Sequence, residues 1–238
     1  DDDTAIYSAY QNGDLDFIDT VPTDQIATLK GTPDFHVVGQ LGTYYMIFNV
    51  KSKLFDGKTV EQAATMRKAL SMLIDRQYII DTVAQTGQQI ATSFIPAGMA
   101  DGNGGILKDA SKHAYPNGSD GYFMPEVDVA GAVELLKSIG YEFDANNMLS
   151  ATTPISFEYL TNNTSGHVAI AECLQQDLAA VGINMTIKSI DWAVFLDERK
   201  AGTYDVARNG WVADFNDPIN MLEMWTTTSG NNDAQFGR

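Results

Sequence analysis

The sequence predicts an α/β (α+β) fold, with a mixed β-sheet flanked by helices. The strongest observation is a β-α-β pattern at about residues 154–190, where two alternating segments enclose a helical one. A second is the composition, because 44% of the 238 residues are hydrophobic and 10% are aromatic, as in folded globular chains. This length predicts one or two domains, with a core large enough to be stable without metal ions or disulfides.

The first fifty residues predict short strands separated by turns. Residues 15–18 are a strand candidate that follows the turn at residues 12–14. A second extended pair is predicted at residues 35–38 and 43–50. The segment 43–50 is the stronger strand, because it is rich in aromatic and β-branched side chains and Gly42 bounds it.

Three helices are predicted from capping residues followed by apolar side chains at helical spacing. Thr59 forms a capping box with Gln62 and begins the first helix, and Asp75 can cap a second helix directly after it. Asp128 can cap the third. We expect this helix to end at Gly140, since glycine readily adopts the left-handed conformation that ends many helices.

The β-α-β unit gives the clearest topology. Residues 155–159 and 183–188 alternate between apolar and polar side chains, and a helix from about Gly166 to Gly182 lies between them. Because crossover connections between parallel strands are right-handed, we expect the two strands to be parallel, either adjacent or separated by one strand.

Two further segments complete the prediction. Asp191 can cap a short helix, and residues 204–211 form a final strand candidate. Residues 96–125 are predicted to be a long irregular excursion, because Gly, Asn, Asp, Ser and Pro dominate them. Loops of this length are usually functional or lie over the surface as arms.

The charge balance restricts the possible partners. With 15 basic and 31 acidic residues the formal charge is −16 at pH 7, and no cluster of Lys and Arg is present to neutralise phosphates. We therefore expect no nucleic-acid partner. We also expect no membrane insertion by this segment, because no apolar run of about 18 residues occurs. The single cysteine, Cys173, excludes an internal disulfide.

The sequence lacks the motifs of enzymes and metal sites. Its three histidines are far apart and no second cysteine accompanies them, so a zinc site is not expected. Phosphate-binding and nucleophile-elbow motifs are not found. We expect no cofactor, no metal and no enzymatic activity. Asp14 and Asp16 suggest acid–base chemistry, but a solvated strand face explains them better.

One constellation suggests a ligand site. The final strand candidate ends at Trp211 and leads into an Asp-rich turn. The Asp214 carboxylate, beside the rings of Trp211 and Phe215, can hold an ammonium group, because aromatic walls lower the local dielectric and add cation–π attraction. A structural alternative is that Asp214 and Asp217 cap a turn or the following helix, with Trp211 in the core. The residues alone leave both interpretations open.

The chain resembles the extracytoplasmic solute-binding proteins that deliver oligopeptides and dipeptides to ABC transporters, of the bacterial family 5 type. The matching segments follow the family's order and cover nearly the whole chain: 9–16, 43–49, 60–80, 135–141, 174–183 and 210–218. The most specific are residues 67–76 and 210–218. The resemblance implies a periplasmic-binding-protein-like lobe.

By this resemblance the chain is the central to C-terminal portion of a longer protein. Residues 1–47 are expected to be the tail of the first lobe and the crossover strand. Residues 48–238 are expected to be the second, peptide-binding lobe, incomplete at its C-terminus. The implied protein is an extracytoplasmic lipoprotein, in the periplasm or on the outer face of the cell membrane. Its implied partners are a short peptide and the ABC transporter permease subunits.

The resemblance also implies roles for individual residues. The family's Asp at the position of Asp214 pairs with the free α-amino group of the peptide, and Trp211, Arg208 and Phe215 are placed to line the same cleft. Main-chain hydrogen bonds to an extended peptide would add affinity that is independent of sequence. Two alternatives stay open: the same fold binding a nickel chelate, a sugar or an opine, and a hydrolase that uses Asp residues.

Overall fold

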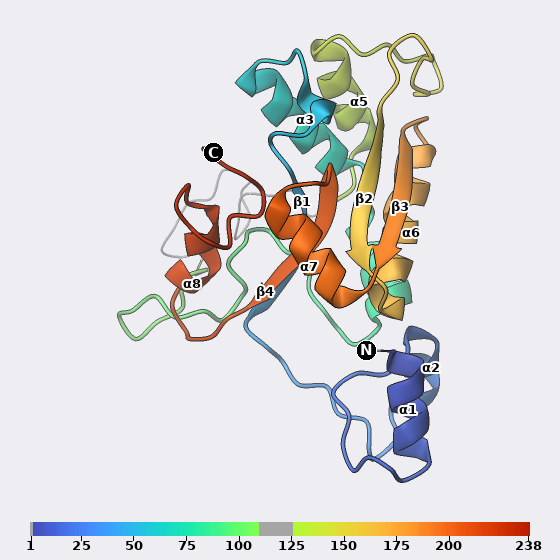
Figure 1. Ribbon diagram of the computed structural model, residues 1–238, viewed down its shortest axis with the longest axis vertical. Helices are drawn as coiled ribbons and strands as arrows, with labels where there is room; N and C mark the ends of the chain where they lie inside the picture. The colour runs from blue at the N-terminus through green and yellow to red at the C-terminus, as the bar shows by residue number, and fades with distance from the viewer. Residues whose placement is uncertain (1, 110–125) are drawn as a thin grey trace.

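A four-stranded mixed sheet organises the structure, a computed structural model that describes residues 2–109 and 126–238 (Figure 1). Its strands lie in the order β1-β4-β2-β3. Their bounds are Gly42–Phe48 for β1, Ser156–Asn162 for β2, Asn184–Ile190 for β3 and Val206–Val212 for β4. β2 pairs in parallel with both β3 and β4, and β1 is antiparallel to β4. The expected mixed sheet is therefore confirmed, and the carboxyl ends of β2, β3 and β4 lie at one edge.

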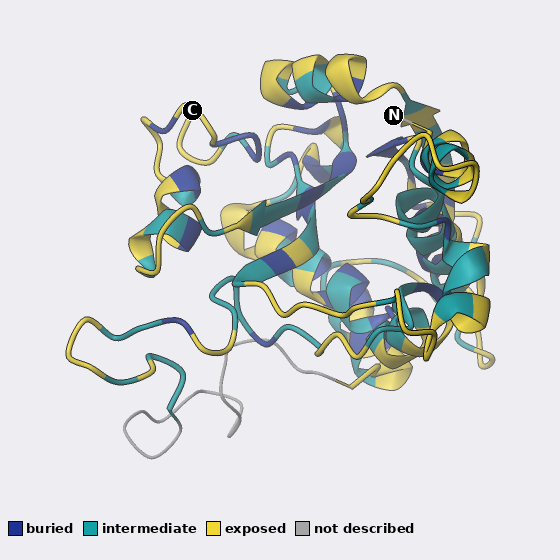
Figure 2. Ribbon diagram, turned by 90° about the horizontal axis from the view of Figure 1, so that it is seen from below, coloured by how far each residue is buried: buried dark blue, intermediate teal, exposed yellow. Residues whose placement is uncertain are grey.

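The predicted β-α-β unit is confirmed as β2, α6 (Ser165–Ala179) and β3, with the two strands as direct parallel neighbours. Alternate side chains of β2 serve two different cores. Phe157 and Tyr159 pack with α3 (Val60–Met72), α5 (Val129–Ser138) and α6, whereas Leu160 packs against Phe195 of α7 (Trp192–Ala201). Figure 2 shows that buried residues concentrate on the strands and on the helix faces that pack against them.

The predicted helix starts are confirmed by their caps. Thr59 Oγ1 accepts a hydrogen bond from the Gln62 backbone at 3.2 Å, and Gln62 Oε1 accepts one from the Thr59 backbone at 3.0 Å. Asp75 caps α4 (Arg76–Ile79), which continues as the π-helical turn η2 (Ile80–Ala84). Asp128 and Asp191 cap α5 and α7. The remaining short elements are η1 (Lys53–Phe55), α8 (Ile219–Leu222) and η3 (Glu223–Trp225).

Two strand predictions near the N-terminus are wrong. Residues 15–18 and 35–38 pair with no other strand in the described part of the chain, and Phe17 and Val38 are 79% and 77% exposed. An isolated extended segment leaves its backbone groups to water and buries nothing, so local composition alone does not make it a strand. Residues 2–31 instead contain two helices that were not predicted, α1 (Asp3–Gln11) and α2 (Thr23–Leu29).

These two helices form a small N-terminal unit, residues 2–31, that lies beside the main body (Figure 1). Residues 32–41 connect it to β1 without a helix or strand. At the end of this connection the Leu41 carbonyl accepts a hydrogen bond from Ala213 at 2.8 Å. The connection therefore arrives next to the turn that follows β4.

The predicted irregular excursion is confirmed for residues 96–109, where the only pairing described is the bridge between Ala100 and Ile106. The rest of that prediction, residues 110–125, lies outside the described residues. Among the helices of residues 2–109 and 126–238, none combines the length and apolar character needed to cross a bilayer.

Candidate functional site

The candidate site lies at the carboxyl edge of the parallel strands. Arg208 and Trp211 belong to β4, and Asp214 and Phe215 follow in the turn after it. The same edge receives the N-terminus of α6 after β2 and that of α7 after β3. In open α/β sheets, ligands bind outside the carboxyl ends of the strands.

Arg208 is half-buried within a set of aromatic rings. Its guanidinium carbon lies 5.2 Å from the ring centre of Trp192, 5.4 Å from that of Tyr44 and 5.5 Å from that of Phe195. These distances are within the range of cation–π attraction, which partly replaces the water that the cation has lost. Burial lowers the pKa of Arg208 below its usual value, yet an arginine stays charged in proteins.

The charge of Arg208 has no acidic partner among the described residues. Arg208 Nη2 donates to His167 Nε2 at 3.0 Å, while Arg208 Nε is buried without a hydrogen-bond partner there. The neighbouring Arg199 does have its carboxylate, with Nε 2.8 Å from Asp233 Oδ2. A desolvated guanidinium without a counter-ion is a place where an incoming anion gains a charge-assisted hydrogen bond.

His167 accepts the hydrogen bond of Arg208 because it is neutral. Burial, together with the positive charge of Arg208, lowers the pKa of His167 from 6.5 to about 4. Tyr44 lies beside both, with its ring centre 5.8 Å from that of His167.

Acid is therefore expected to destabilise the protein through His167. Between pH 6.5 and about 4 the unfolded chain binds a proton at this histidine and the folded chain does not, so stability is complete above that window and falls as the pH drops through it. Such a pKa difference corresponds to about 3 kcal/mol. Denaturant unfolding of wild type and His167→Gln between pH 4 and 8 measures it. The stability difference between the two proteins should shift toward the variant on acidification, and a pH-independent difference would contradict the assignment.

Trp211 and Asp214 are brought together by a third residue, Asn220 of α8. The Trp211 indole Nε1 donates to Asn220 Oδ1 at 3.1 Å, and the Asp214 backbone N donates to the same oxygen at 2.8 Å. Asn220 Nδ2 lies 3.5 Å from Asp214 Oδ2. The Asp214 side chain is exposed, and no ion pair to it is found among the described residues.

The alternative interpretation, in which Asp214 and Asp217 are caps and Trp211 is a core residue, is correct only for Asp217. Asp217 Oδ1 accepts from the Ile219 backbone at 2.9 Å, so Asp217 does support the start of α8. Asp214 caps no helix, and Trp211 is half-buried and belongs to neither hydrophobic core cluster. Phe215 is 54% exposed.

Arg208 and Trp211 project from opposite faces of β4, since they are three positions apart on a strand. The structure therefore places Trp211 and Asp214 in one group and Arg208 in another along the same edge. Gly210, between them, lies opposite Tyr44, and a Cβ there would come within 2.4 Å of the Tyr44 ring. A larger residue at position 210 would therefore force the Tyr44 ring to move.

Four residues of the site, Tyr44, His167, Trp192 and Asn220, were not among the sequence-predicted site residues. The first three come from β1, α6 and α7, which only strand order and register bring to Arg208. Asn220 alone could have been proposed from the sequence, because it lies only six positions after Asp214.

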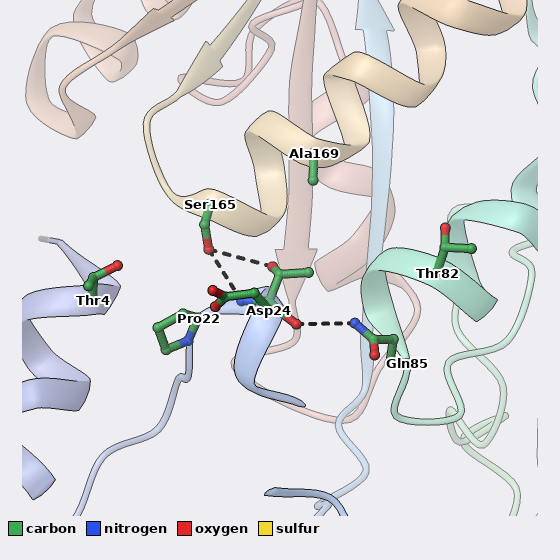
Figure 3. Close-up of a pocket in the computed structure, with 8 residues that line it drawn as sticks. Thr4, Pro22, Asp24, Thr82, Gln85, Ser165 and Ala169 are labelled. Carbon is green, nitrogen blue, oxygen red and sulfur yellow. Dashed lines mark hydrogen bonds between the residues drawn. The ribbon is translucent and has the colours of Figure 1, made fainter. Parts of the chain in front are cut away.

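A cavity of about 430 Å³ separates the N-terminal unit from α6 and η2 (Figure 3). It is lined by Thr4, Pro22, Thr23, Asp24, Thr82, Gln85, Ser165 and Ala169. Its contacts are polar: Thr23 N lies 3.5 Å from Ser165 Oγ, and Gln85 Nε2 donates to the Thr23 carbonyl at 3.2 Å. Ser165 Oγ also donates to the carboxylate of Asp3.

A second cavity, of about 330 Å³, lies at the opposite edge of the sheet, between the segment after β1 and the segment before β4. It is lined by Asn49, Lys51, Ser52, Lys53, Glu158, Gly202, Thr203, Tyr204 and Asp205. None of the four predicted site residues lines this cavity or the one beside α6.

Comparison with known proteins identifies relatives along nearly the whole chain. The oligopeptide-binding protein OppA of Bacillus subtilis is 29% identical over 228 residues, which cover 94% of this chain and 38% of that protein. The periplasmic oligopeptide-binding protein OppA of Haemophilus influenzae is 31% identical and is matched over 95% of this chain and 39% of its own length. The chain thus spans about two fifths of the length of these curated relatives.

Solved structures share the fold. The murein tripeptide binding protein MppA of Escherichia coli superposes with a TM-score of 0.79 at 26% identity, covering 99% of this chain and 42% of that one. Haemophilus influenzae OppA in complex with RPPGFSPFR has a TM-score of 0.74 at 28% identity, with the same coverage. The expected periplasmic-binding-protein-like fold is confirmed. Residues 1–233 match the family described as "Bacterial extracellular solute-binding proteins, family 5 Middle", and the chain belongs to this family.

Proposed function

We propose that the protein is the substrate-binding component of an ABC-type peptide transporter and that it binds short peptides through their charged ends and extended main chain. The observation that carries this proposal is the presence of two opposite charges at one sheet edge, Asp214 and Arg208, that have no ion-pair partner among residues 2–109 and 126–238. A peptide with free termini carries the two complementary charges. Relatives named for binding oligopeptides, and one solved with RPPGFSPFR, support the choice of ligand.

Asp214 is proposed to bind the α-amino group, with Trp211 and Phe215 as walls of that subsite. The carboxylate is exposed in this chain, so its attraction for an ammonium group is weak while water surrounds it. Closure of another lobe over this edge would exclude the water and strengthen the pair. Arg208, already half-buried among aromatic rings, is proposed to bind a carboxylate or carbonyl of the same ligand.

We further propose that residues 1–47 are the tail of the first lobe and the crossover strand, and that residues 48–238 are most of the second lobe. Two observations support this division for the residues before β1, whereas β1 itself pairs with β4 and contributes Ile47 to the core. Among the described residues, neither hydrophobic core cluster includes a residue before Tyr45. The N-terminal unit is attached instead by polar contacts, including that of Lys30 Nζ with the Gln85 carbonyl at 2.7 Å.

The proposed location is extracytoplasmic, and the proposed protein partners are the permease subunits of the transporter. The protein is proposed to be a binding protein and not an enzyme, as its relatives are. A hydrolase acting through Asp214 would need a second catalytic group beside it. Among the described residues, the hydrogen-bond partner of the Asp214 carboxylate is the side-chain amide of Asn220.

The change Asp214→Asn in the full-length protein is expected to weaken binding of a free tripeptide by about 2–4 kcal/mol, because the ligand's ammonium group is then enclosed without its counter-charge. Titration calorimetry with the free tripeptide and its N-acetylated form provides the measurement. Wild type should prefer the free form, and the variant should lose that preference.

Asp217→Asn is the matched control, since it removes an acid from the same turn while an amide oxygen can still accept from Ile219. It should leave both affinities within about 0.5 kcal/mol of wild type. Equal affinity of the wild type for the free and acetylated peptides would refute the role of Asp214.

A further inference from the structure

The side chain of Asn220 connects the two residues of the proposed ammonium subsite. Its oxygen receives the Trp211 indole N–H at 3.1 Å and the Asp214 backbone N–H at 2.8 Å. Its nitrogen lies 3.5 Å from Asp214 Oδ2. Asn220 is half-buried, whereas Asp214 is exposed. Asn220 therefore connects the exposed Asp214 to the more buried part of the protein.

The orientation of this amide follows from its partners. An indole N–H and a backbone N–H can only donate, so the atom that faces both must be the amide oxygen. The amide nitrogen is then turned toward the carboxylate, which can only accept when ionised. Asn220 therefore holds the Oδ2 side of Asp214, and no hydrogen bond to Oδ1 is found among the described residues. Oδ1 is the oxygen left for a ligand.

Asn220 is itself anchored to the body of the protein. It lies on α8, and the next residue, Met221, is only 1% exposed. The Asn220 backbone N donates to the Asp217 carbonyl at 3.0 Å, which closes the turn. Within the turn, Asn216 Oδ1 accepts from the Ala100 backbone at 2.8 Å. At its start, Ala213 N donates to the Leu41 carbonyl at 2.8 Å. The turn that carries Asp214 is thus held at several points.

We propose that Asn220 is a positioning residue for peptide recognition: it fixes the Asp214 carboxylate beside the Trp211 indole before the ligand arrives. This inference rests on the proposed function, in which Asp214 receives the α-amino group. Ordering a mobile acidic side chain and its turn on binding costs affinity, and a preformed site avoids that cost. Loss of the Asn220 contacts should therefore weaken binding of the free amine selectively, by about 3- to 10-fold.

Two variants of the full-length protein separate positioning from simple packing. Asn220→Leu keeps the branched shape of the side chain and removes all three hydrogen bonds, whereas Asn220→Gln keeps an amide that can accept from both N–H groups and donate to Asp214. Asn231→Leu, at an exposed position outside the turn, is the control. The probes are a free tripeptide and its N-acetylated form, with affinities from calorimetry. The indole ¹H–¹⁵N resonance of Trp211, assigned with Trp211→Phe, reports the hydrogen bond directly.

We expect Asn220→Leu to lower affinity for the free tripeptide by about 3- to 10-fold, to change affinity for the acetylated form by less than about 2-fold, and to shift the Trp211 indole resonance. Asn220→Gln should retain more of the preference for the free amine than Asn220→Leu does, with a Trp211 resonance closer to that of wild type. The control should behave as wild type.

An Asn220→Leu protein that keeps the wild-type preference for the free amine would overturn the proposal, as would an Asn220→Gln protein that loses the preference as completely as Asn220→Leu does. If Asn220→Leu does not fold, Asn220→Ser takes its place, because a serine hydroxyl is too short to reach both donors and should show the same selective loss. A wild-type protein without any preference for the free amine contradicts the proposed function itself, and that result is seen before any Asn220 variant is tested.

Discussion

Replacing Phe195 with alanine is expected to lower the free energy of unfolding by about 3–5 kcal/mol. Phe195 is fully buried on α7 and is the largest fully buried side chain of the cluster that it forms with Leu160 and Ala207. Its ring also lies 5.5 Å from the ring of Trp192, centre to centre. The substitution therefore opens a cavity between α7 and the sheet.

The same ring supports two cations, which adds to the expected loss. The guanidinium carbon of Arg199 lies 4.9 Å from its centre and that of Arg208 lies 5.5 Å from it. Removing the ring takes cation–π attraction from two groups that have already lost water. Phe195→Ala should therefore also impair peptide binding at Arg208, beyond its effect on stability.

Denaturant unfolding monitored by circular dichroism measures the effect on stability. Val194→Ala is the matched control, because Val194 precedes Phe195 on the same helix and is 49% exposed. Its effect should stay within about 0.5 kcal/mol. If the two variants lose similar stability, α7 does not cover the core in the way described.

The second large effect is expected at the buried ion pair of Arg199 and Asp233. Asp233→Leu should destabilise the protein by about 3–5 kcal/mol, because it leaves the Arg199 guanidinium buried without a counter-charge. The side chains of Arg199 and Asp233 are only 11% and 6% exposed, and their atoms Nε and Oδ2 are 2.8 Å apart. Arg208 is a second cation nearby, since the guanidinium groups of Arg199 and Arg208 both lie over the Phe195 ring.

A double-mutant cycle tests this pair. Arg199→Met alone should also destabilise, whereas Arg199→Met combined with Asp233→Leu should recover most of the loss, because no unpaired charge then stays buried. The exposed pair of Lys137 and Glu134 provides the comparison, with side chains 40% and 71% exposed. Glu134→Gln should change stability by less than about 1 kcal/mol. Additive losses in the cycle would show that the two buried side chains act independently.

Much of the helical structure could be predicted because its signals are local. The capping box at Thr59 and the cap at Asp128 each join residues three positions apart. A short stretch of sequence therefore contains both partners of each capping hydrogen bond. The parallel pairing of β2 and β3 was predictable for a similar reason, since the handedness of a crossover restricts the topology. The false strands at 15–18 and 35–38 mark the limit, because a strand depends on a partner that local sequence does not specify.

The candidate site likewise has one part that the sequence predicts and one part that depends on tertiary packing. The sequence alone determined that a tryptophan, an acid and a turn follow one another at the end of a strand, and it carried the family resemblance. Only the tertiary structure decided that Arg208 lies among Tyr44, His167 and Trp192, and that Asn220 bridges Trp211 and Asp214. The physical reason is that caps and turns are closed by hydrogen bonds between near neighbours in the chain. The surroundings of Arg208 instead depend on strand order, register and burial, which arise when side chains from β1, α6 and α7 pack against β4.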